Sequence, residues 1–329
     1  MQVRKLFALI VLLIVAVAAY LAFATFVPYG GSEARSADVR PGDSTRVIAS
    51  KLQSAGAVRS STAFLLYHYL LGGKTKLKAG EYDFDHPETV AEVHRHLAHG
   101  DIAARTLVIP EGFNIFDIAT AVQAAGLGSH DDFLNEARTD LSLISDIAPQ
   151  ANSLEGYLFP DTYKFTRSTS MHDMAATMVK RFRQRAQGIG LLAKGADLPS
   201  IVTMASFVEK ETAVPEERPL VAGVFYNRLR DRIALATDPS VIYASQLAGT
   251  WHGTIHQSEL HSDSAYNTYT HAGLPPGPIC NPGTSALEAA MSPAQTDFLY
   301  FVAGPNGHHR FARTLEEHNH NVSLYRHGR

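Results

Sequence analysis

One segment of this chain is apolar on nearly every side, the run SIVTMASFVEKET at residues 200–212. At 100° per residue, the polar side chains of Thr203, Ser206 and Lys210 gather in one narrow stripe. Pro199 suits a first helical turn, and Asp197 or Ser200 can cap the free amides. The pattern therefore predicts a helix that is buried over most of its surface.

Two acidic residues, Glu209 and Glu211, end this helix within its apolar arc. They fall at about 80° and about 280° on the helical wheel, on opposite flanks of the buried face, and cannot act as an adjacent pair. Glu211 lies between Phe207 and the pair Met204 and Val208, and apolar surroundings raise the pKa of a carboxyl group. Glu211 is therefore the better candidate for a proton donor near neutral pH.

A structural role for both acids is the alternative. Ion pairs with Arg218, Arg228 or Lys210 would also perturb their carboxyl groups. The wheel alone leaves the catalytic and the structural interpretation open.

The amino terminus carries an unbroken apolar run at residues 6–27, preceded by Arg4 and Lys5. At 1.5 Å per residue it spans roughly 33 Å, enough to cross a hydrocarbon core of about 30 Å. The positive flank predicts a cytoplasmic amino terminus with the rest of the chain outside. A cleaved signal peptide is the alternative, because Ala22-Phe23-Ala24 resembles a cleavage site, but the run is long for a signal core.

Composition narrows the class of protein. A net charge of −3 without a long basic run makes nucleic acid an unexpected partner. Cys280 is the single cysteine, so an internal disulfide is excluded. The 329 residues, 45% of them apolar, can hold an anchor and one or two folded domains.

Mixed helical and extended patterns follow the apolar run, without a regular strand–helix–strand rhythm, and predict an α+β fold. Further helices are expected at residues 61–71, 87–98, 171–187 and 218–233 and from Asp238 onward, a strand at 77–84, and a hairpin of 299–303 with 308–312. Residues 39–56 and 109–126 form a weak repeat of a strand end, a glycine turn, a helix and a glycine cap. The repeat suggests either two polymer-holding modules or one favourable way to begin a helix.

The loop SAYNTYTHAGLPPGPICNPG at residues 264–283 combines aromatic, hydroxyl and amide side chains. Such groups suit sugar rings, which present both C–H faces and hydroxyls, although a structural loop without a ligand is also consistent with them. The candidate contacts are Tyr266, Asn267, Thr268 and Asn281.

The sequence gives little support for a metal site or for a catalytic serine. The carboxyl-terminal histidines His308, His309, His318 and His320 lack the spacing of a zinc site, and no serine lies in a G-x-S-x-G elbow. We therefore expect no metal and no cofactor.

Several ordered motifs resemble one known family. VTMASFVEKETA (202–213), VFYNRL (224–229), TDPSVIY (237–243), AYNTYT (265–270), GLPPGPI (273–279) and NPG (281–283) closely resemble the endolytic murein transglycosylases of the MltG/YceG-like family. The resemblance covers nearly the whole chain. It implies that Glu211 is the catalytic acid/base, with Glu209 and Asn281 available to orient the acid or the sugar.

The resemblance also implies an organisation and a reaction. It suggests an anchor at residues 1–27, a linker at 28–38, a small LysM-like subdomain at 39–101 and a catalytic domain at 102–329. The enzyme would cleave the bond between N-acetylmuramic acid and N-acetylglucosamine, leave 1,6-anhydro ends and so end strand elongation. Ordinary glycosidases need two carboxylates. The resemblance implies that the substrate's own 6-hydroxyl is the nucleophile, so that one acid would suffice.

The expected protein is thus a single-pass enzyme of the inner membrane with a periplasmic catalytic domain. Its partners are peptidoglycan strands, the inner membrane and, in the same membrane, peptidoglycan synthases. A hydrolase that uses water and a non-catalytic murein-binding scaffold are the rival interpretations.

Overall fold

The computed structural model describes residues 2–31, 35–73, 75–304 and 307–328. Helices and strands are mixed, as the sequence predicted. The chain divides into two compact units, one made of residues 1–105 and 164–168 and the other of residues 106–163 and 169–329.

The first unit begins with helix α1, Gln2–Phe26, which confirms a helix over the amino-terminal apolar run. Its described side chains from Arg4 to Tyr20 are exposed. By length and composition this helix can cross a membrane. A second apolar stretch, Leu191–Glu211, passes the same test but is largely buried inside the second unit, as a core helix is.

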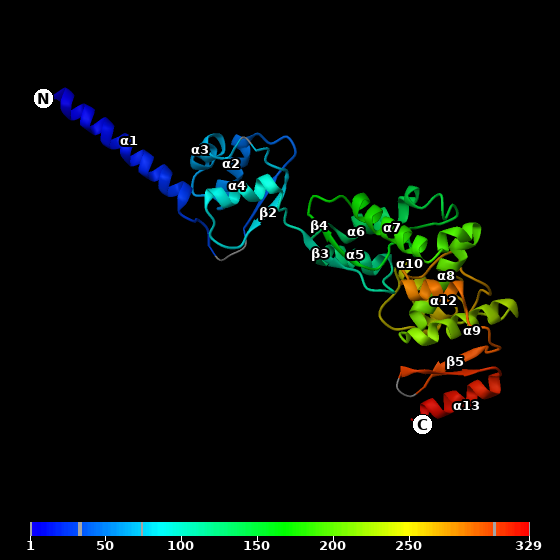
Figure 1. The fold of residues 1–329 in the computed structure, drawn as a ribbon. Coiled ribbons are helices and arrows are strands. Elements are labelled where there is room, and N and C mark those ends of the chain that lie inside the picture. Colours follow the sequence, from blue (N-terminus) through cyan, green and yellow to red (C-terminus); the bar gives the residue numbers. More distant parts are fainter. Residues whose placement is uncertain (1, 32–34, 74, 305–306, 329) are drawn as a thin grey trace. The chain divides into compact units, whose positions relative to one another are not determined.

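A small module follows α1 (Figure 1). Strand β1, Arg35–Val39, pairs antiparallel with β2, Gly80–Phe84. Helices α2, Thr45–Ser54, and α3, Ser61–Leu70, lie between the two strands in the chain, and α4, Val90–His99, follows them. The inward residues Val39, Leu52, Phe64, Tyr82 and Leu97 belong to one core. Residues 35–38 of β1 belong to the segment expected to be a linker, yet the strand is part of the module, because Ala37 and Val39 contribute to this core.

The weak repeat is visible as structure. β1 leads through a turn at Gly42 to α2, and β3, Arg105–Val108, leads through a turn at Gly112 to α5, Ile115–Ala124. Both turn glycines have positive φ, +91° and +79°, a conformation that favours glycine. Ser44 and Asn114 cap the two helices in equivalent places.

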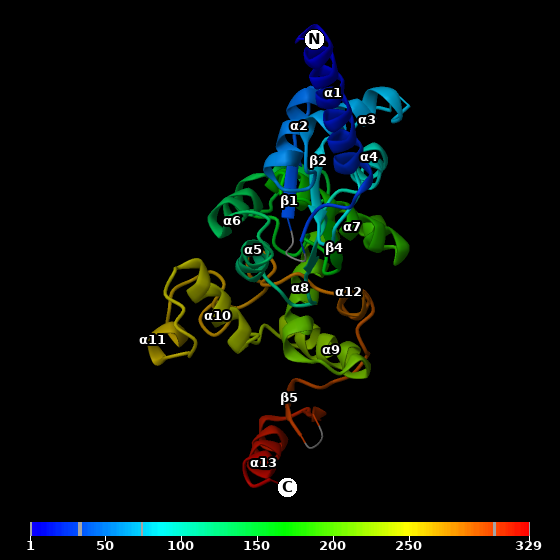
Figure 2. The ribbon, with the colours of Figure 1, turned by 90° about the vertical axis from the view of Figure 1, so that its left-hand side faces the viewer.

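The second unit is mainly helical. After α5 come α6 (His130–Thr139), α7 (Met171–Gly188), α8 (Leu198–Glu211), α9 (Arg218–Arg230), α10 (Asp238–Leu247), α11 (Gln257–Leu260) and α12 (Thr284–Met291). Strand β4, Thr162–Phe165, lies at the boundary, since its last two residues belong to the first unit. Short 3₁₀ turns lie at Leu141–Leu143, Leu191–Asp197 and Pro215–Glu217. α8 packs against α12 and α9 (Figure 1), and α10 lies beside α11 (Figure 2).

α8 is the predicted apolar helix, and it begins two residues earlier than expected. Asp197 is its N-cap residue but makes no side-chain cap bond, and Pro199 lies in the first turn as predicted. Every residue from Ile201 to Val208 is buried, which includes the expected polar stripe at Thr203 and Ser206. Ser206 is satisfied in the core, since its hydroxyl donates to the carbonyl of Thr203 and accepts from the amide of Ile279.

The carboxyl-terminal hairpin is confirmed. β5, Tyr300–Ala303, pairs antiparallel with β6, His309–Ala312, and helix α13, Leu315–Arg326, packs against both. Part of the expected turn, residues 305–306, lies outside the described residues.

Candidate active site

Glu211 is the last residue of α8, and Thr212 ends the helix in an extended conformation. The buried run before it anchors this end of the helix against α12 and α9. Among the described residues, none makes a hydrogen bond or an ion pair with the Glu211 carboxyl group. Its proton is therefore not committed to another protein group.

The surroundings of Glu211 favour its neutral form. Burial, with a smaller contribution from the negative charge of Asp238, raises the pKa of Glu211 to about 7, against the opposing charge of Arg228. Its position at a helix C-terminus acts in the same direction, because the helix dipole disfavours an anion there. Near neutral pH the group is divided between its two protonation states, as an acid that later acts as a base requires.

Arg228 places a positive charge near this acid. Its Nε donates to the carbonyl of Leu299 (2.6 Å) and its Nη1 to that of Leu235 (2.8 Å), while its guanidinium carbon lies 5.1 Å from the centre of the Tyr300 ring. These contacts come from main-chain carbonyls and a ring, so they fix the guanidinium without neutralising it. Arg228 is an electrostatic neighbour of Glu211 and not its ion-pair partner.

Asp238 and Tyr269 are two further electrostatic neighbours of Glu211. Asp238 begins α10, and its Oδ1 accepts a hydrogen bond of 2.7 Å from the Tyr269 hydroxyl. Tyr269 is 43% exposed and lies within electrostatic range of Glu211. A fixed, partly exposed aromatic ring near a proton donor can hold the apolar face of a sugar.

Asn267 and Thr268 are turned into the protein. The Asn267 amide nitrogen donates to the carbonyl of Ser262 (2.9 Å), and its oxygen accepts from the amide of Tyr269 (3.0 Å). The Thr268 hydroxyl accepts from the amide of Thr237 (3.1 Å). The two residues thus shape the loop that presents Tyr269 and attach it to the start of α10.

Asn281 is the centre of a buried network. Its side-chain oxygen accepts from the amide of Leu158 (2.9 Å), and its nitrogen donates to the carbonyl of Phe113 and to Oε1 of Glu155 (both 2.9 Å). Glu155 also accepts from the amide of Ile115 (3.0 Å), and burial raises its pKa to about 8. Glu155 therefore enters this network as a largely protonated group at neutral pH.

The four side chains expected to contact the substrate are buried. Their exposed fractions are 7% for Tyr266, 0% for Asn267, 1% for Thr268 and 0% for Asn281. Tyr266 packs edge-on against Tyr243, 5.1 Å between ring centres, and its hydroxyl accepts from Asn152 (3.4 Å). Protein groups already satisfy the polar atoms that were expected to meet a sugar, so these side chains build the wall of the site.

Glu209 has the structural environment that the sequence left open for both acids. Its Oε1 accepts from Nη2 of Arg218 (2.8 Å) and its Oε2 from the amide of Gly283 (2.9 Å), which caps α12. Burial raises the pKa of Glu209, opposed by the Gly283 amide and by Arg218. Glu111 also approaches Arg218, at 3.6 Å. Both oxygens of Glu209 are thus occupied.

From the sequence, Asp238 was expected only as the start of a helix, Tyr269 only as one of the aromatic residues of the loop at 264–283, and Arg228 only as an ion-pair partner. Each lies in a motif that carried the family resemblance, which was the available signal. A helical wheel contains no information about residues that other elements bring toward Glu211.

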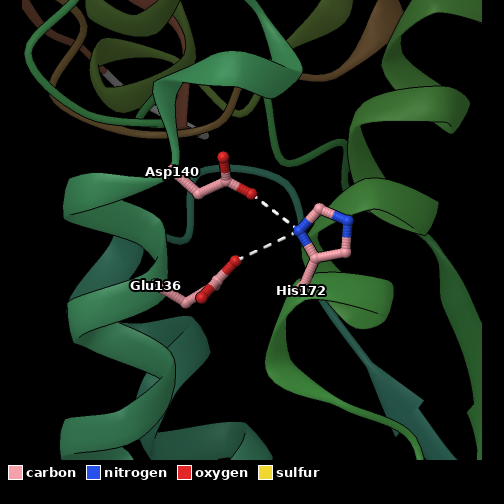
Figure 3. A group of neighbouring side chains, drawn as sticks. All are labelled: Glu136, Asp140 and His172. Carbon is pink, nitrogen blue, oxygen red and sulfur yellow. Dashed lines mark hydrogen bonds and ion pairs between the residues drawn. The ribbon is translucent and has the colours of Figure 1, made fainter.

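One cluster offers three donor atoms of metal-binding type, Glu136, Asp140 and His172 (Figure 3). Nδ1 of His172 lies 2.7 Å from Oδ2 of Asp140 and 3.4 Å from Oε1 of Glu136, so the histidine already pairs with both carboxylates. Hydrogen bonding to Asp140 raises the pKa of His172, which favours this ion pair. Elsewhere, His308 and His309 contact Glu217 at 3.0 and 2.7 Å. We assign no ligand to these groups.

One protonatable carboxyl group, held at the end of a buried helix, defines a site for general acid–base chemistry. The chain belongs to the YceG-like family, whose sequence profile matches residues 37–324.

Known proteins are similar to this chain over most of its length. An endolytic murein transglycosylase of Bacillus subtilis is 33% identical over 299 residues, which cover 86% of this chain and 82% of the relative. One from Streptococcus pneumoniae is 31% identical over 314 residues, 86% of this chain but only 56% of the longer relative. The crystal structure of a yceG-like protein from Listeria monocytogenes aligns with a TM-score of 0.59 at 32% identity, over 88% of this chain and 99% of that one.

Proposed function

We propose that this chain is an endolytic murein transglycosylase in which Glu211 is the catalytic acid/base. The family membership and the name shared by its curated relatives support the activity. The observation that carries the assignment of Glu211 is its uncommitted carboxyl group with a pKa of about 7. The neighbouring acid of the motif, Glu209, is held by Arg218 and Gly283.

In the proposed reaction, protonated Glu211 gives its proton to the oxygen that bridges N-acetylmuramic acid and N-acetylglucosamine. The C–O bond breaks, and N-acetylglucosamine leaves with a new hydroxyl group. The Glu211 carboxylate then removes the proton of the 6-hydroxyl of N-acetylmuramic acid as that oxygen bonds to the anomeric carbon. The 1,6-anhydro end forms and Glu211 is protonated again, so no water is consumed.

Arg228 and Tyr269 are the proposed neighbours of the substrate. The fixed charge of Arg228 limits the rise in the pKa of Glu211, and so eases the return to the carboxylate. The exposed ring of Tyr269 provides a face for a sugar. Tyr266, Asn267, Thr268 and Asn281 position this surface from behind, and Glu209 supports the end of α8 through Gly283.

The amino-terminal part supports a location. We propose that α1 anchors the protein in the inner membrane by a single span, with the catalytic unit in the periplasm, because Arg4 and Lys5 precede the apolar run. The same anchor would hold the enzyme near membrane-bound peptidoglycan synthases, where strands are nascent. A fusion of a periplasm-dependent reporter to the carboxyl terminus should be active.

The module at residues 39–101 is proposed to be the LysM-like subdomain. The order strand, helix, helix, strand, with the two strands paired antiparallel, supports this assignment. Its role would be to hold the glycan strand. Catalytic residues are proposed to lie within residues 102–329.

The experiment that tests the activity is incubation of the full chain in detergent with purified murein, followed by mass spectrometry. We expect internal cleavage with 1,6-anhydro-N-acetylmuramic acid ends. Glu211→Gln should fold and release none of them. Reducing ends in place of anhydro ends would establish the hydrolase, and unchanged murein would favour the scaffold.

A further inference from the structure

A cavity of about 440 Å³ lies in the second unit at the opposite end of α8 from Glu211. Pro199 and Thr203 of α8 line it, together with the segment 146–153 and the rigid turn Pro276–Pro278. Its size falls within the usual range of small-molecule sites, roughly 300–1,000 Å³. The reaction proposed for Glu211 does not use it.

The walls of the cavity are preformed. Pro278 rests on the backbone of Gly156, where an added Cβ would approach within 2.5 Å of the proline ring. Gly156 has a φ of +87°, so both its conformation and this close contact require glycine. Tyr157, the next residue, forms part of the wall with its ring fixed edge-on against Phe182, 5.2 Å between ring centres.

Tyr157 points to a ligand. It is 1% exposed and lines the cavity, yet its hydroxyl group makes no hydrogen bond with any of the described residues. The hydroxyl group of a nearly buried tyrosine normally finds a hydrogen-bond partner, so this one is free to bond to a molecule in the cavity. A bound molecule that offers an oxygen acceptor would supply that partner.

The charge of the lining restricts the class of ligand. Asp146 is its one charged side chain, and Arg183 already pairs with it through two hydrogen bonds of 2.6 and 2.9 Å. The remaining lining consists of proline, alanine, glycine and isoleucine surfaces with small neutral polar groups, including Asn152. Among the described residues, no lining cation is present to receive a carboxylate, which disfavours a peptide with free acid groups.

We propose that this cavity binds a neutral N-acetylhexosamine residue of the glycan strand, as a second sugar site remote from the cleaved bond. Proline and alanine surfaces receive the acetamido methyl group and the C–H face of the ring, and the Tyr157 hydroxyl donates to a sugar oxygen. Thr203 and Glu211 are eight residues apart, about 12 Å along the helix. One extended strand can therefore contact both sites. This inference rests on the proposed function.

The cavity is also connected to the loop beside the acid. Asn152 donates to the Tyr266 hydroxyl, and an added Cβ on Gly277 would lie 3.2 Å from the same oxygen. Tyr266, expected from the sequence to touch sugar, thus backs the cavity instead.

The test is calorimetric titration of the full-length Glu211→Gln chain in detergent with N,N′,N″-triacetylchitotriose, which this variant cannot cleave. We expect binding that Tyr157→Phe weakens about 3- to 10-fold, the range of one hydrogen bond. Ala196→Phe, which places a ring at the exposed rim of the cavity, should remove this binding step and leave only binding by the proposed module at residues 39–101. Tyr226→Phe, which removes a hydroxyl bonded to Ala290 outside the cavity, should leave binding to the cavity unchanged.

If the Tyr157 and Ala196 variants bind the trisaccharide as tightly as the Glu211→Gln chain alone, the sugar lies elsewhere and the inference is overturned. The absence of any binding would also overturn it. Binding of D-alanyl-D-alanine in competition with the trisaccharide would assign the cavity to the peptide stem and also overturn it. The activity test on murein is independent. Anhydro ends without trisaccharide binding would leave the proposed function intact and remove only the second site.

Discussion

Nη2 of Arg218 lies 2.8 Å from Oε1 of Glu209, and the two side chains are 7% and 5% exposed. This buried ion pair is formed two residues before Glu211, whose carboxyl group has no such partner among the described residues. The same short motif therefore contains one acid whose two oxygens are held by Arg218 and Gly283 and one that can exchange its proton. Environment, and not residue type, separates their roles.

Arg218→Met should destabilise the protein strongly. The variant leaves Glu209 and the nearby Glu111 without their common cation, and loss of one partner of a buried pair costs about 3–5 kcal/mol. Urea unfolding followed by circular dichroism measures the change. Arg230→Met, which removes an exposed arginine paired with Asp231, is the matched control and should be nearly neutral.

Activity should decline as pH rises through about 7. The reaction begins with protonated Glu211, whose pKa is about 7, so the fraction of competent enzyme falls above that value. The measurement is the pH profile of kcat/KM for release of anhydro ends. A profile that stays flat from pH 6 to 9 would argue against Glu211 as the proton donor.

Asp238→Asn should move that decline to lower pH. The Asp238 carboxylate raises the pKa of Glu211, so removing its charge lowers this pKa. Asparagine keeps an oxygen for the Tyr269 hydroxyl, which limits other changes. Glu316→Gln, an exposed change in α13, should leave the profile in place. A shift of equal size in both variants would indicate a general charge effect.

The sequence predicted the helices and strands better than it predicted which distant residues lie close together. α8, α3, α7 and the terminal hairpin follow from periodicity, capping and turn residues, which act within a few positions. The burial of Asn267 and Thr268 depends on Ser262, Thr237 and the start of α10. Likewise, Asp238 and Arg228 come near Glu211 only through packing of separate helices. No local pattern contains such contacts, so Glu211 was predictable and its neighbours were not.

Glu155 should make the folded protein less stable in alkaline solution. Its folded pKa of about 8 lies above its ordinary value of 4.5, so between these values the folded protein holds a proton that the unfolded chain has released. The stability linked to this proton is fully present below pH 4.5 and is lost as pH rises through 8, by up to about 1.4 kcal/mol per pH unit. Glu211 contributes in the same sense up to about pH 7.

Glu155→Gln removes this titration. The amide takes the place of one acceptor for Ile115 or Asn281, so the variant is expected to lose about 1–3 kcal/mol at every pH. Its free energy of unfolding should fall less steeply between pH 7 and 8 than that of the parent protein, since Glu211 contributes equally to both. Urea titrations of both proteins at pH 6, 7, 7.5 and 8 measure the difference in slope. Parallel curves would mean that Glu155 is ionised throughout, and that the network around Asn281 contains a carboxylate.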